Sequence, residues 1–115
     1  MSNTFKLASK AGITSADIVY TVAGSTTTIV LGLMIGNTTT SQITVTVSLL
    51  SDTGNRTNAN DEVNQTVELV TNAPIPAGSS LELLAGNKVV MEATDNITVT
   101  ATGAADVALS ILEIT

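Results

Sequence analysis

The sequence predicts an all-β fold: a two-sheet antiparallel β-sandwich, immunoglobulin-like or jelly-roll, with about eight or nine short strands and no substantial helix. Threonine, valine and isoleucine are frequent, and these β-branched residues fit the pleated surface of a sheet better than a helix. Several short segments alternate apolar and polar residues, with Gly, Asn, Asp or Pro between them. Since the aromatic residues are only Phe5 and Tyr20, we expect an aliphatic core.

The first expected strands are residues 4–8, 16–22, 26–36 and 42–50. Alternation in "TTTIVLGLMIG" predicts that one face of residues 26–36 points inward, namely Ile29, Leu31, Leu33 and Ile35. In "QITVTVSLL" the inward set is Ile43, Val45, Val47 and Leu49. The "GNTTTS" between these segments has hairpin turn chemistry, so we expect the two segments to form a β-hairpin.

The remaining expected strands are residues 65–71, 80–84, 88–93, 96–102 and 107–115. Both prolines of the chain, Pro74 and Pro76, follow the first of these in "NAPIPAGSS". Proline cannot donate a hydrogen bond to a sheet, so we expect Pro74 and Pro76 to end the strand and form a stiff crossover between the sheets. Ile75, between them, is a candidate contact with a neighbouring subunit.

The length of 115 residues predicts one domain, residues 1–115, without room for a second core. The longest polar stretch, "SDTGNRTNANDEVNQ", predicts a long loop over residues 51–65. Cysteine and histidine are both absent, which excludes disulfides, thiolate metal sites and histidine general bases.

The net charge is −6, with four basic residues against ten acidic ones. Nucleic-acid binding needs clustered Lys and Arg, so we expect no nucleic-acid partner. "MSNTFKLASK" lacks the apolar core of a signal peptide, and "IVLGLMI" is far shorter than the ~20 residues of a membrane span. We therefore expect synthesis in a cytoplasm and no membrane partner.

Oxygen-bearing side chains in residues 51–65 raise the alternative of a calcium site; they are Asp52, Asn55, Asn58, Asn60, Asp61 and Glu62. Gly54 and Arg56 stand where an EF-hand loop needs ligands, so a solvated loop is the better interpretation.

Four glutamates lie on expected strands and raise the alternative of glycoside hydrolysis: Glu68, Glu82, Glu92 and Glu113. A sugar cleft usually has aromatic platforms, and the aromatic residues of this chain are only Phe5 and Tyr20. We expect no catalytic residue, cofactor or metal site. The four N-x-T sequons, at Asn37, Asn55, Asn64 and Asn96, are a by-product of the threonine content.

The N-terminal residues 1–12 have two interpretations. Lys6 and Lys10 are half of the basic residues and lie close to Phe5. Lysines on an edge strand discourage pairing with other chains, which favours an edge strand. The alternative is a docking arm, in which Phe5, Lys6 and Lys10 anchor the protein to an acidic partner and deletion of residues 1–10 abolishes binding without unfolding the sandwich.

Two segments, "TIVLGLMI" and "ITVTVSLL", are uncharged, β-prone and free of proline. Such segments aggregate when exposed, so we expect them to be covered, either inside the sandwich or against neighbouring subunits. This favours a closed homo-oligomer.

The chain resembles a family of small structural proteins of tailed-bacteriophage virions, including phages of marine cyanobacteria. The resemblance is carried by "MSNTFK", "VYTVAGSTTTIVLGLMIGNTTTSQITVTV", "APIPAGSSLELLAGNKVVMEATDNITVTA" and "SILEIT". It spans nearly the whole chain and is weakest over residues 51–65. Many relatives have proline at the position of Ala23.

The resemblance implies a capsid decoration (cement) protein at the virion surface, often a homotrimer, which binds over junctions of the major capsid protein and stabilises the shell. Two alternatives remain open. One is a neck, tail or fibre-base adaptor of the virion, and the other is a receptor- or glycan-binding sandwich. The second is weakened by the lack of tryptophan, because sugar and protein recognition rely on large aromatic side chains.

Overall fold

The computed structural model describes residues 2–51, 65–84 and 87–115. Within these residues the chain forms nine β-strands and no helix, in two antiparallel sheets, which confirms the predicted β-sandwich. The strands are β1 (Asn3–Ile13), β2 (Ala16–Thr21), β3 (Thr27–Asn37), β4 (Ile43–Leu50), β5 (Thr66–Ile75), β6 (Ser80–Leu83), β7 (Val89–Met91), β8 (Asn96–Ala101) and β9 (Ala105–Ile114).

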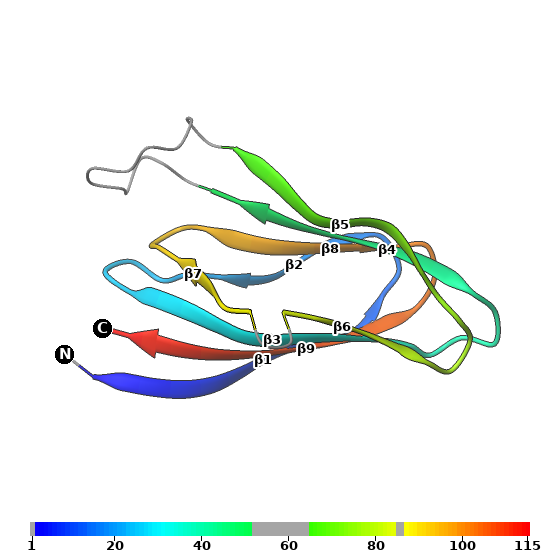
Figure 1. Ribbon diagram of the computed structural model, residues 1–115, viewed down its shortest axis with the longest axis horizontal. Helices are drawn as coiled ribbons and strands as arrows, with labels where there is room; N and C mark the ends of the chain where they lie inside the picture. The colour runs from blue at the N-terminus through cyan, green and yellow to red at the C-terminus, as the bar shows by residue number, and fades with distance from the viewer. Residues whose placement is uncertain (1, 52–64, 85–86) are drawn as a thin grey trace.

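The two sheets form two layers, which Figure 1 shows edge-on. Sheet A has the order β1-β9-β3-β6, with β7 also paired to β3, and sheet B has the order β2-β8-β4-β5. Strands β6 and β7 pair with different parts of β3 and so behave as one interrupted strand. Every link between consecutive strands crosses to the other sheet except β4–β5 and β6–β7. Of the two expected sandwich types, this strand order is that of a jelly roll.

The core lies between the sheets and is aliphatic, as the composition predicts. Alternate residues of β4, β8 and β9 point into it, because neighbouring residues of a strand face opposite sides. Its fully buried members, at most 4 % exposed, include Ile43, Val45, Val47, Ile97, Val99, Leu109 and Ile111. The inward set expected for β4 is therefore confirmed at Ile43, Val45 and Val47.

The inward set expected for β3 is wrong in its first half. Thr28 and Val30 are fully buried, whereas Ile29 is only half-buried. The pairing with β9 passes from Val30 opposite Ile111 to Gly32 opposite Ser110, so Leu31 is an extra residue in a β-bulge. The bulge reverses the alternation, and beyond it Leu33 and Ile35 are buried as expected.

The expected hairpin between residues 26–36 and 42–50 is also wrong, because β3 and β4 lie in different sheets. Residues 38–42 bridge the two layers. The buried Asn37 side chain holds this bridge: Nδ2 donates to the carbonyl oxygens of Ser41 at 2.8 Å and Ile75 at 2.9 Å, and Oδ1 accepts from the Thr39 N–H at 2.9 Å. The buried side-chain amide of Asn37 needs hydrogen-bond partners from both the bridge and the end of β5. This requirement favours a crossover between the sheets rather than a tight turn.

The proline segment does connect the two sheets, as predicted, between β5 of sheet B and β6 of sheet A. It does not end the strand as early as expected, since β5 continues to Ile75 with Pro74 opposite Thr44. Proline has no backbone N–H, and an edge strand such as β5 tolerates the missing donor because one of its sides pairs with no other strand. Gly78, with φ 70°, then turns the chain, and the Ser79 N–H donates to the Pro76 carbonyl at 3.1 Å.

Candidate functional site

The two sheets present outer faces of different chemistry. Residues paired across neighbouring strands share a face, so the register identifies the side chains on each. On the outer face of sheet B the rows are Ile18–Thr98–Ser48–Glu68 and Ala16–Thr100–Thr46. Hydroxyl groups dominate these rows, and such a face is well solvated.

The outer face of sheet A is apolar at one end. There the register aligns one side chain from each of four strands in a row: Phe5, Leu112, Ile29 and Val90. Phe5 is 75 % exposed and Val90 60 %. Leu7, which is 67 % exposed, belongs to the next row with Ser110 and Gly32. We call this surface the apolar face.

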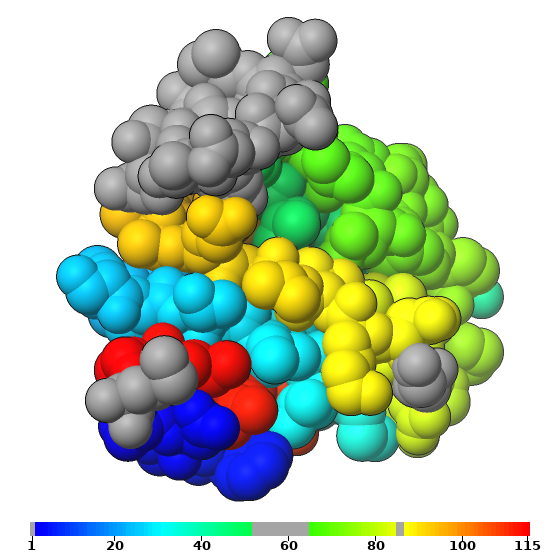
Figure 2. Space-filling model, turned by 60° about the vertical axis from the view of Figure 1, so that its left-hand side comes forward, coloured from blue at the N-terminus to red at the C-terminus, as the bar shows by residue number. Residues whose placement is uncertain are grey.

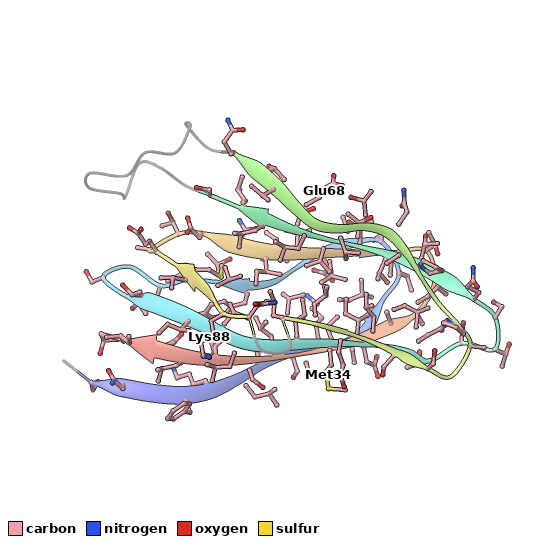
Figure 3. All side chains as sticks on the ribbon, in the orientation of Figure 1. Met34, Glu68 and Lys88 are labelled. Carbon is pink, nitrogen blue, oxygen red and sulfur yellow. The ribbon has the colours of Figure 1, made fainter. Side chains whose placement is uncertain are left out.

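Figure 3 shows Met34 of β3 and Glu68 of β5 pointing away from the sandwich on opposite sides. Figure 2 shows the N-terminal strand in blue, the C-terminal strand in red and β3 in cyan side by side. This matches the sheet order and brings the two ends of the chain together. Backbone hydrogen bonds join Ser2 and Thr115 at 3.0 and 3.2 Å.

The apolar face contains a hollow of about 220 Å³. The hollow is lined by Gly32, Leu33, Met34, Glu82, Leu83, Ala108 and Ser110. It exists because small residues occupy the outward positions of β3 and β9 there, while the longer side chains of Met34 and Glu82 stand beside them. A Cβ added to Gly32 would meet no atom within 4 Å.

Of the two N-terminal alternatives, the structure has the edge strand, because β1 pairs with β9 along most of its length. It does not bring the three candidate residues together: Phe5 lies on the apolar face, whereas Lys6 and Lys10 alternate to the other side of the strand. Deletion of residues 1–10 would remove most of β1, so it cannot separate binding from folding as expected.

Both lysines are engaged in ion pairs. Lys6 Nζ lies 2.7 Å from Glu113 Oε1, and Lys10 Nζ lies 3.0 Å from Asp17 Oδ1. Inward-pointing charges on an edge strand oppose the addition of a further strand, which is the protective role predicted for lysines here.

Glu113 also joins the two sheets. Its Oε2 accepts a hydrogen bond of 2.6 Å from the Tyr20 hydroxyl of β2, and that hydroxyl lies 2.8 Å from Thr28 Oγ1 of β3. Hydrogen bonds from Lys6 and Tyr20 lower the pKa of the Glu113 carboxyl. Burial and the hydrogen bond to Glu113 raise the pKa of Tyr20 to about 12. These groups link strands β1, β2, β3 and β9 and so stabilise the fold.

The predicted contact of Ile75 with a neighbouring subunit is wrong. Its side chain is 1 % exposed and belongs to the core, so a neighbouring subunit cannot reach it. The two prolines hold the backbone extended, and alternation then directs Ile75 inward between its exposed neighbours Pro74 and Pro76.

The structure separates three of the four strand glutamates. Glu68 and Glu82 lie on opposite outer faces, and Glu113 is held by Lys6 and Tyr20. In residues 2–51, 65–84 and 87–115 no group of three or more acidic side chains is placed to hold a metal ion. The calcium alternative in residues 52–64 lies outside the described residues. The described part of the chain also contains no helix of the length and apolarity that a membrane span requires.

Sequence reasoning missed the apolar face and the Tyr20–Glu113 contact. A signal for the face was present in "VALSILEIT", where the residues between the buried positions change from Ala108 and Ser110 to Leu112 and Ile114. For Glu113 no signal existed, because its partners Tyr20 and Lys6 are distant in the chain and lie on two different strands.

No protein-family model matches the sequence, and no curated protein matches it. One similar solved structure comes from the disulfide-linked pili of Bacillus endospore appendages. It is 13 % identical, with a TM-score of 0.47, and the match covers 97 % of this chain and 84 % of that chain. A similarity of this size is too small to assign this chain a function.

Proposed function

We propose that this protein is a structural protein of a bacteriophage virion, a capsid decoration protein that binds the assembled shell. The proposal is supported by the sequence resemblance described above. It is also supported by one observation on the fold: the apolar face carries Phe5, Leu7 and Val90, each at least 60 % exposed, while the opposite outer face carries hydroxyl groups. A protein with one such face is suited to having that face covered in an assembly.

The proposed action is mechanical. A decoration protein that binds the complete shell, but not its dissociated subunits, stabilises the shell by mass action. Contacts with several copies of the major capsid protein act together, so weak individual contacts give lasting attachment. The net charge of −6 limits association between finished particles.

The test is electron cryo-microscopy of the parent particle with this protein located in the density. A copy number proportional to the number of capsomers in the shell supports the decoration function. A copy number equal to that of a single ring at a vertex overturns decoration in favour of a neck or tail adaptor. Absence from the purified particle overturns the virion role altogether.

A glycan array separates the proposal from the remaining alternative. We expect no binding above that of a control protein, because neither outer face presents tryptophan or tyrosine. Saturable binding to a defined glycan would favour the receptor-binding function instead.

A further inference from the structure

We propose that the apolar face is covered by a second copy of this chain, in a two-fold pair in which Phe5 of each copy occupies the hollow of the other. This inference rests on the proposed function in one respect, namely that the apolar face is buried in an assembly. It adds what covers that face, which the resemblance does not state.

The first support is the presence of both complementary shapes on one face. Phe5 is 75 % exposed and stands at one end, and the hollow lies further along the same face, between Gly32 and Met34. A cavity of about 150 Å³ with apolar walls is large enough to bind benzene. The hollow of about 220 Å³ therefore has room for a phenyl ring.

The second support is symmetry. In a two-fold pair, residue i of one copy contacts residue j of the other, and j contacts i. From the strand spacing and the rise per residue, Phe5 and the centre of the hollow are about 14 Å apart on the face. The two-fold axis lies in the plane of the interface, perpendicular to the line from Phe5 to the hollow, and passes through its midpoint over Leu112 and Ser110 of β9. This axis places Phe5 of each copy over the hollow of the other.

The third support is area. Sheet A is four strand positions wide, since β6 and β7 share one, and β3 and β9 are 11 and 10 residues long. With strands ~4.8 Å apart and ~3.3 Å per residue, the flat projection of the whole outer face of sheet A, which includes the apolar face, is about 650 Å². A standard stable interface buries ~800 Å² per partner, and the side-chain relief of the face adds to its projection.

The fourth support is charge. A chain with a net charge of −6 repels its copies, but the row Phe5–Leu112–Ile29–Val90 carries no ionisable group. The outward acids are Glu82, which lines the hollow, and Asp106, and both lie toward the end of sheet A opposite Phe5. The two-fold axis places the acidic ends of the two copies away from each other.

A contact between two identical faces related by a two-fold axis closes at two copies, so this arrangement predicts a dimer as the unit in solution rather than the trimer that the resemblance implies. Sedimentation equilibrium of the purified full chain over a concentration series measures this directly. We expect reversible association to twice the chain mass of 11.7 kDa.

Two variants test the arrangement itself. Phe5→Ala removes the side chain that fills the hollow, and Gly32→Leu fills the hollow from within, where an added Cβ meets no atom within 4 Å. We expect each variant to raise the dimer dissociation constant by at least about tenfold, as for truncation of a central aromatic contact. The double variant should lose no more than the stronger single variant, because both remove the same contact.

Ile18→Ala is the matched control, since Ile18 is 53 % exposed but lies on the outer face of sheet B. We expect its dissociation constant to equal that of the unchanged chain. Urea unfolding of every variant shows whether it is folded, and if Phe5→Ala is not, Gly32→Leu and Val90→Lys give the same test on the same face.

Three results would overturn the inference: a monomer at the highest soluble concentration, a trimer, or a dimer that Phe5→Ala and Gly32→Leu leave intact. None of these results affects the copy number on the particle, so failure here is distinguishable from failure of the proposed function.

Discussion

The Tyr20 hydroxyl donates a hydrogen bond of 2.6 Å to Glu113 Oε2, across the gap between sheet B and sheet A. The other carboxylate oxygen of Glu113 lies 2.7 Å from Lys6 Nζ of the edge strand β1. Three strands from two sheets are therefore joined through one carboxylate, at the end of the sandwich where the chain begins and ends (Figure 1). This contact allows several predictions on stability.

Tyr20→Phe should lower the free energy of unfolding by about 1.5–3 kcal/mol, the usual range for a hydrogen bond to a charged group. Urea unfolding at neutral pH measures this loss. Thr100→Val is the control, since it removes an exposed hydroxyl on the outer face of sheet B and should change stability by less than about 0.5 kcal/mol. Equal effects of the two substitutions would contradict a specific role for the Tyr20 hydroxyl.

The pKa of Tyr20 can be measured directly, because it is the only tyrosine and the chain has no tryptophan. Near-ultraviolet absorbance during an alkaline titration should give a midpoint near pH 12 in the folded protein, against 10.0 for an ordinary tyrosine. A pKa that is higher in the folded state than in the unfolded state stabilises the fold below pH 10.0, and this contribution is lost as pH rises toward 12. A midpoint near 10 in the folded protein would contradict the burial and hydrogen bonding of Tyr20.

Glu113 should make the fold sensitive to acid. Its pKa is lowered by the hydrogen bonds from Lys6 and Tyr20, so the carboxylate contributes stability above the unfolded value of 4.5 and loses it as pH falls through the lower, folded value. We compare urea unfolding of the unchanged chain and Glu113→Gln from neutral to acidic pH. The difference in the free energy of unfolding between the two proteins should shrink below pH 4.5. The contributions of the other carboxylates are the same in both proteins and cancel in this difference. A difference independent of pH would contradict the prediction.

Asn37→Ala should destabilise the crossover more than an average substitution, by about 2–4 kcal/mol, because it removes a hydrogen-bond partner from several buried or part-buried polar groups. These include the Ile75 carbonyl oxygen, 2.9 Å from Asn37 Nδ2, and the Thr39 N–H, 2.9 Å from Oδ1. Thermal unfolding measures the loss. Asn3→Ala is the matched control at an exposed position of β1 and should have little effect. Similar melting temperatures for the two variants would show that Asn37 does not hold the crossover.

Gly103→Ala and Gly24→Ala form a matched pair. A Cβ at Gly103 would lie 2.7 Å from Ile43 Cγ2, and Ile43 is a core residue with little freedom to move. We expect a loss of about 1–3 kcal/mol in the free energy of unfolding from this overpacking. At Gly24 an added Cβ meets no atom within 4 Å, so the same substitution should be neutral or stabilise by up to about 1 kcal/mol. The opposite order in urea unfolding would contradict the packing around Ile43.

Several elements of the fold were predictable from local pattern. The strict alternation in β4 fixed which side chains face inward, since a shift by one residue would expose Ile43, Val45 and Val47 to water. The prolines restricted their segment to an edge strand and a crossover, because neither can donate to a neighbouring strand. The β-branched composition and the alternation of apolar and polar residues determined the all-β class.

Tertiary structure decided what depends on residues distant in the chain. "GNTTTS" has the chemistry of a hairpin turn, and only the bonds of Asn37 to Ile75 and Ser41 made it a bridge between sheets. The bulge at Leu31 reversed the face of β3 because β9 fixes the register on both sides of it. Likewise, Phe5 and Val90 lie in one row only because β1, β9, β3 and β7 are neighbours in one sheet. A sequence determines which faces a strand has, but the pairing of strands decides which faces come together.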